Sequence, residues 1–207
     1  GPLGAQFLLW EYATVIASRL IGINPFDQPD VESAKIAARG MLEQRDAVIP
    51  ALFENSGIEV RATSLELGSA STVAEAIKTL LAQVSDDDGY LSVQAYLDRT
   101  SVPEAAELRD LFAKATRRPV TFGWAPRFLH STGQYHKGGP RQGVYLQIVA
   151  KASKDIQVPG RDFSFGELIA SQAAGDAKVL GALDRPVLTL TLGEAKAGLA
   201  AIKNAIA

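Results

Sequence analysis

Three short segments of this 207-residue chain are apolar along almost their whole length: RPVTF (118–122), GVYLQIVA (143–150) and RPVLTL (185–190). A strand with one face in water alternates apolar and polar residues. A nearly continuous apolar run instead fits a strand that is covered on both faces. Segments with helical spacing lie between these runs, so the sequence predicts an α/β fold in which helices flank a mixed or parallel sheet.

The expected elements follow from periodicity and from turn and cap residues. We expect strands at 58–62, 90–96, 118–124, 143–150 and 186–192, and helices at 72–84, 103–116, 165–183 and 194–206. Ser101 is the expected N-cap of the helix at 103–116, and Ser164 with Glu167 predicts a capping box before the helix at 165–183. Two further helices, at 5–21 and 29–46, precede a boundary that we place near residues 48–56.

Composition excludes several classes of function. The formal net charge is -2, which leaves no general basic surface for nucleic acid. The chain has no cysteine, so disulfides and thiolate zinc sites are excluded, and the lack fits a cytoplasmic protein. No apolar run reaches about 18 residues, so we expect neither a transmembrane helix nor a membrane partner.

The stretch INPFDQPDVESAK, at 23–35, places polar side chains on both sides of an expected helix start. Gln28 lies just before that start, and Lys35 lies two turns into the helix on roughly the same face. A glutamine and a lysine so placed could hold a phosphate or a hydroxyl group, because a helix start also attracts anions. The alternative is that Asp27 caps the helix and Lys35 is an ordinary surface lysine.

The pattern Phe26-Asp27-Gln28-x-x-Val31-Glu32-x-x-Lys35 resembles the C-terminal signature of the glucose-6-phosphate isomerases, and LLWEYATVIASRLIGIN before it is similar to the helix that leads into that signature. Asp30 departs from the family, which commonly has glycine there. The resemblance implies two sugar-isomerase (SIS) domains that interconvert glucose 6-phosphate and fructose 6-phosphate without a cofactor. A carboxylate base moves a proton between C2 and C1 through a cis-enediol, while a lysine and a histidine assist ring opening.

By position, the resemblance implies that Lys35 is the active-site lysine and that Gln28 contacts the substrate. The family's catalytic glutamate, ring-opening histidine and Ser/Thr phosphate pocket lie further upstream, and residues 1–48 offer no counterpart for them. We therefore expect a C-terminal fragment that is inactive alone and has the remainder of the isomerase chain as its partner. The opening GPLG (1–4) also resembles the remnant of a removed affinity tag.

Most of the remaining chain resembles the extra C-terminal region of a bacterial isomerase subgroup, which includes actinobacterial forms and isomerases fused to transaldolase. The resembling segments are DGYLSVQAYLDR, RPVTFGWAPRFLHSTGQYHKGGP, GVYLQI and VPGRDFSFGELIASQAAGD. We therefore divide the chain into a tag remnant at 1–4, the last two helices of the second SIS domain at 5–48, and an extra α/β domain at 57–207.

Both histidines of the chain lie in RFLHSTGQYHKGGP, at 127–140, between two expected strands. Ligand loops of α/β proteins occupy such sheet edges. We interpret this stretch as a glycine-rich loop in which His130, Gln134, His136 and Lys137 bind substrate. The alternatives are a buried, structural His130 followed by a tight turn, or a loop that faces a partner. A zinc site does not fit, because no carboxylate is near in sequence.

The sequence is also compatible with a function that is not enzymatic. Residues 57–207 would then form a non-catalytic module for oligomerisation, docking or regulation, and the histidine stretch would bind a partner, which includes a second copy of the chain.

Overall fold

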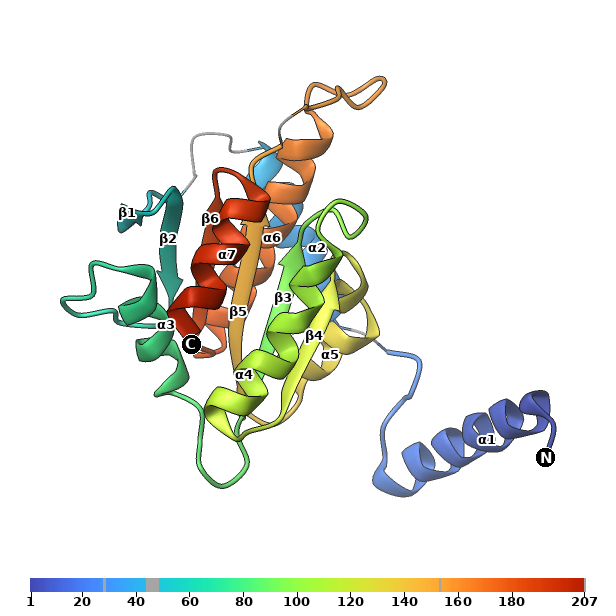
Figure 1. Ribbon diagram of the computed structural model, residues 1–207. Coiled ribbons are helices and arrows are strands. Elements are labelled where there is room, and N and C mark those ends of the chain that lie inside the picture. Colours follow the sequence, from blue (N-terminus) through green and yellow to red (C-terminus); the bar gives the residue numbers. More distant parts are fainter. Residues whose placement is uncertain (28, 44–48, 153, 207) are drawn as a thin grey trace.

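The computed structural model describes the whole chain except residues 28, 44–48, 153 and 207 (Figure 1). The helices are α1 (Leu3–Ile21), α2 (Pro29–Glu43), α3 (Val73–Leu81), η1 (Pro103–Glu107), α4 (Leu108–Thr116), η2 (Arg127–Leu129), α5 (Ser131–Gly138), α6 (Phe165–Ala182) and α7 (Ala195–Ile206), where η denotes a 3-10 helix. The strands are β1 (Phe53–Asn55), β2 (Ile58–Thr63), β3 (Tyr90–Tyr96), β4 (Val120–Trp124), β5 (Gly143–Ala150) and β6 (Val187–Leu192).

The strands form one mixed sheet in the order β1-β2-β6-β5-β3-β4. Strands β6, β5, β3 and β4 are parallel, and the β1–β2 hairpin joins the β6 edge antiparallel. From β3 the chain moves outward to β4, and it then crosses back to β5 on the other side of β3. The parallel part therefore has a switch point between β3 and β5, and ligands of α/β proteins bind beyond the carboxyl ends of strands near such a point.

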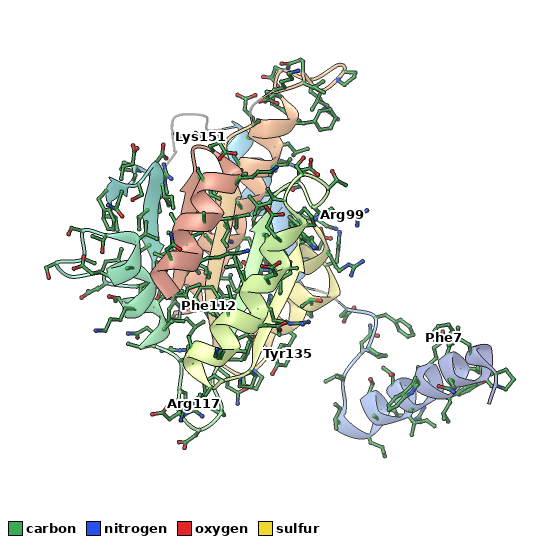
Figure 2. All side chains as sticks on the ribbon, viewed as in Figure 1. Phe7, Arg99, Phe112, Arg117, Tyr135 and Lys151 are labelled. Atoms are coloured by element: carbon green, nitrogen blue, oxygen red, sulfur yellow. The ribbon has the colours of Figure 1, made fainter. Side chains whose placement is uncertain are left out.

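The two faces of the sheet are buried but differ in chemistry. Helices α3, α4 and α7 cover one face, and α5, α6 and α2 cover the other (Figure 1). The first face is apolar: it carries Leu91 and Val93 of β3, Leu146 and Ile148 of β5, and Leu188 and Leu190 of β6, all fully buried. Phe112 of α4 packs into the same core (Figure 2). This arrangement confirms the predicted α/β class and its mixed sheet.

Helix α1 lies outside this body and is separated from α2 in the sequence by residues 22–28 (Figure 1). Its apolar side chains face solvent, as Figure 2 shows for Phe7; Trp10 is 71% exposed and Leu20 is 82% exposed. The left-handed Gly22 ends the helix, and its N–H donates to the carbonyl of Ser18. Among the described helices, α1 included, we find none with the length and apolar character that crossing a bilayer requires.

Three local expectations are wrong. The segment expected as one helix at 103–116 is divided into η1 and α4, and Ser101 does not cap it, because its hydroxyl donates to the carboxylate of Asp98. The glycine-rich stretch expected as a loop at 127–140 is largely helical, as η2 and α5. The short strand β1 is not among the expected strands. By contrast, the capping box of Ser164 and Glu167 is present at the start of α6.

Helix α2 is held against α6 by a close approach of the two backbones. A Cβ atom at Gly175 of α6 would lie 2.7 Å from the backbone nitrogen of Ala38 and 2.9 Å from its Cα. Backbone atoms cannot move aside as a flexible side chain can, so only glycine allows this separation. The position of every α2 side chain relative to the sheet therefore depends on Gly175.

Gly175→Ala should loosen α2 from α6, because the added methyl group overlaps the α2 backbone. We expect a loss of about 1–3 kcal/mol in stability and faster amide hydrogen exchange throughout α2. Gly40→Ala is the matched control: no atom lies within 4 Å of a Cβ there, so α2 should gain about 1 kcal/mol from helix propensity. Equal protection of α2 in the two variants would contradict this account of the contact.

Candidate functional site

A cavity of about 810 Å³ lies between α2 and the carboxyl end of the parallel strands. Its walls come from three places: α2, the segment that follows β4, and the segment that leads from β5 into the first turns of α6. The lining residues are Lys35, Ala38, Arg39, Leu42, Pro126, Leu129, His130, Arg161, Asp162, Phe163, Leu168 and Gln172. The cavity therefore occupies the edge of the sheet where α/β folds place their ligands.

Two of the residues predicted for the site, Lys35 and His130, line this cavity together. The Lys35 side chain is 55% exposed, and its Nζ lies 2.6 Å from Oε1 of Glu32. An exposed pair of this kind contributes little to stability, so the ammonium group can exchange Glu32 for a ligand. His130 is exposed at the end of η2. Docking of α2 on α6 thus brings the two predicted segments to one place.

The other predicted residues lie elsewhere. Gln28 falls outside the described residues. Gln134 is half-buried on α5, and His136 and Lys137 are only 3% exposed on the same helix. None of these three α5 residues lines the cavity. Their predicted contact with substrate stays a prediction. In this structure the side chains of His136 and Lys137 bind partners in the interior, Gln94 and Asp176.

Lys137 forms a buried ion pair with Asp176 of α6. Nζ of Lys137 lies 2.6 Å from Oδ1 of Asp176, and each side chain is 1% exposed. Burial raises the pKa of Asp176, and the Lys137 ammonium opposes that rise. Because a buried charge is costly without its partner, this pair fixes α5 against α6.

The pair belongs to a polar row that crosses the second face of the sheet. The Gln147 amide donates to Oε1 of Gln94 (3.2 Å) and to Oδ2 of Asp176 (3.5 Å), and the Thr189 hydroxyl donates to Oε1 of Gln147 (3.0 Å). The three residues other than Asp176 come from adjacent strands in register, with Gln94 opposite Gln147 and Gln147 opposite Thr189. Sequence reasoning missed the row; its available signal was one glutamine inside each of two apolar strands, VQA and LQI.

His136 extends the polar row beneath α5. Its Nδ1 lies 3.4 Å from Nε2 of Gln94, which fits a neutral ring whose Nδ1 accepts the amide proton. Burial lowers the pKa of His136 to about 4, and the charges of Lys137 and Arg185 act in the same direction. The imidazole is therefore neutral at physiological pH.

The buried guanidinium of Arg185 closes the C-terminal end of α5. It donates to the carbonyl oxygens of Lys137 (2.8 Å), Gly139 (2.8 Å) and Pro140 (3.1 Å). A cation suits the negative end of a helix. These tertiary bonds explain how a stretch with three glycines forms a helix, since local propensity alone disfavours it.

The loop at residues 155–164 is hydrogen-bonded to the start of α6 on the other side of the cavity. Asp155 accepts hydrogen bonds from the Ser164 hydroxyl (2.6 Å) and from the backbone N–H groups of Ile156 and Gly166 (2.9 and 2.8 Å). These bonds, that of Ser164 first, lower the pKa of Asp155. The loop is thereby fixed to the start of α6, and with it the residues that it presents to the cavity.

Comparisons with known proteins identify a short related stretch. No family model matches the chain. Glucose-6-phosphate isomerases from two Synechococcus strains, one of them Synechococcus elongatus, are each 32% identical over 78 residues, which is 38% of this chain. The chain spans only 15% of the length of these curated relatives. A hypothetical protein from Thermus thermophilus has a similar fold, with a TM-score of 0.53 at 16% identity over 65% of this chain and 37% of its own.

Replacing only one member of the buried ion pair should lower the free energy of unfolding far more than replacing both. Lys137→Met leaves the Asp176 carboxylate buried without its cation, which should cost about 3–5 kcal/mol in urea unfolding. The double variant Lys137→Met/Asp176→Leu should recover most of that loss, because an apolar pair of similar volume needs no ionic partner. A double variant that is less stable than the single one would contradict this interpretation.

Acid stability should depend on His136. The neutral ring stabilises the fold fully above the unfolded pKa of 6.5, and this contribution is lost as the pH falls toward the folded pKa of about 4. At pH 5 the loss should be roughly 2 kcal/mol. His136→Asn keeps an acceptor for Gln94 but does not titrate. Its unfolding free energy should therefore fall less than that of the wild type between pH 7.5 and pH 5, and parallel losses would disprove the assignment.

Proposed function

We propose that this chain is the C-terminal part of a glucose-6-phosphate isomerase and that Lys35 acts at its active site. The main observation in support is that Lys35 and His130, which lie in two segments distant in sequence, line one cavity at the carboxyl edge of the sheet. The 78-residue similarity to cyanobacterial glucose-6-phosphate isomerases supports a relation to this class.

In this proposal the Lys35 ammonium leaves Glu32 and donates to an oxygen of the sugar phosphate. An ammonium group in that place protonates the ring oxygen during opening and stabilises the negative charge that develops on an enediolate. Gln28 contacts the substrate, as the resemblance implies, and His130 contacts it from the cavity wall that follows β4. The carboxylate that moves the proton comes from the remainder of the isomerase chain, so the isolated chain is inactive.

Gln134, His136 and Lys137 act indirectly in this scheme. Their helix, α5, begins directly after His130, and the Lys137–Asp176 pair and the polar row hold that helix on the sheet. We therefore propose that His136 and Lys137 position the His130 segment from the interior.

The exposed apolar side chains of α1 favour a docking role for this helix. Phe7, Trp10 and Ile16 are each at least 58% exposed, although such side chains are normally buried. We propose that the remainder of the isomerase chain covers α1, which would also set α2 and Lys35 beside the missing part of the active site.

Lys35→Ala should lower kcat/KM of the complete isomerase by about 100-fold or more, because the donor to the substrate oxygen is lost. Folding should be unchanged, since the side chain is exposed. The measurement is a coupled assay of fructose 6-phosphate conversion, with the exposed Lys78→Ala on α3 as the matched control.

Two results would count against the proposal. An unchanged kcat/KM in Lys35→Ala would remove Lys35 from the catalytic set. Isomerase activity in the chain alone, measured beside the complete enzyme, would show that the base lies within these 207 residues.

A further inference from the structure

We propose that the cavity beside α2 contains an anion site of its own, in which Arg39 and Arg161 bind the phosphate group of a small phosphate ester. This inference deepens the isomerase proposal and rests on it for the class of ligand, because the site is the cavity in which Lys35 and His130 are proposed to contact the sugar phosphate. It concerns binding by this chain alone and needs no group from the remainder of the isomerase chain.

The charges around the cavity favour an anion. Its lining carries three basic side chains, those of Lys35, Arg39 and Arg161, against one acidic side chain, that of Asp162. Lys35 is paired with Glu32. Within the part of the chain that the structure describes, neither Arg39 nor Arg161 has an ion pair or a side-chain hydrogen bond, whereas Arg61 pairs with Glu59 and Arg118 pairs with Asp86. Two guanidinium groups without protein partners among the described residues thus face one cavity.

Arg161 has a backbone position that is fixed before any ligand arrives. It ends a tight turn, Val158-Pro159-Gly160-Arg161, in which the Arg161 N–H donates to the carbonyl of Val158 at 3.1 Å. Gly160 has φ +71°, the left-handed conformation that a type II turn requires at its third residue. The Val158 N–H also donates to the carbonyl of Phe163, which closes the loop at its base. Little backbone entropy remains to be lost on binding.

Arg39 is placed by the helix contact described above. It lies one turn after Lys35 on α2, so both side chains lie on one helix face, and it follows Ala38, whose backbone touches Gly175 of α6. The two arginines therefore come from separate elements that are both anchored to α6. The planar fork of each guanidinium matches the oxygens of a phosphate group.

The size and the remaining walls of the cavity indicate a small organic ligand. A volume of about 810 Å³ falls in the range of small-molecule sites. Leu129, Phe163 and Leu168 supply an apolar wall beside the cations, which suits the carbon skeleton of an ester. A polyanionic macromolecule is disfavoured, because the net charge of the chain is -2.

The test is isothermal titration of this chain with inorganic phosphate and with glucose 6-phosphate at low ionic strength. We expect millimolar or tighter binding of the ester, weaker binding of inorganic phosphate, and at least a tenfold loss of affinity for both in Arg39→Gln/Arg161→Gln. Arg127→Gln is the matched control: Arg127 is exposed on η2 and does not line the cavity, so binding should change less than twofold. Both arginines of the site are exposed, and circular dichroism should show unchanged folding.

Three results would overturn the proposal: no heat of binding with either ligand in the wild type, full affinity in the double variant, or equal affinity for phosphate and the ester, which would rule out an ester site. Arg161→Lys should bind less tightly than the wild type and more tightly than Arg161→Gln, because it keeps the charge without the fork. Since the readout is binding to this chain, its failure would leave the Lys35 assay of the isomerase proposal unaffected.

Discussion

The geometry of the candidate site depends on the contact between Gly175 of α6 and the backbone at Ala38 of α2. The contact sets how closely α2 lies on the α/β body, and that spacing creates the cavity. Lys35 and Arg39 lie within one turn of the contact, so their positions relative to His130 and Arg161 follow from it. A glycine in the middle of an eighteen-residue helix costs helix stability, and the close packing of a second helix offsets that cost.

The two faces of the sheet contribute to the fold in different ways. The face under α3, α4 and α7 is filled by aliphatic side chains, which provide non-directional stability. The face under α5 and α6 carries Gln94, Gln147 and the Lys137–Asp176 pair, whose geometry is directional. Such groups are costly unless each finds its partner, so they specify one position for α5. Because α5 directly follows His130, the position of α5 also sets the position of the His130 segment and of the cavity wall that it forms.

The elements with a local sequence signal could be predicted, whereas features that depend on contacts between distant residues could not. Strands β3 and β5 match their predicted bounds, because apolar runs bounded by turns are local signals. Helix α5 was missed because bonds from Arg185 and Asp176, distant in sequence, stabilise its glycine-rich segment. Lys35 and His130 were each identified from their own stretch, but their shared cavity arises only when α2 docks. The sequence around Arg39 and Arg161 does not distinguish them from other arginines, because only the folded structure shows whether an arginine has an ion-pair partner.

Helix α1 has a thermodynamic consequence for the chain as it stands. Apart from Ser18 and the half-buried Pro25, residues 1–27 are exposed in the folded state. Their unfolding uncovers little apolar surface, so they should contribute almost nothing to the heat capacity of unfolding. Calorimetry should therefore give a heat-capacity increment about 0.3 kcal/mol/K below that expected for a fully packed chain of this length.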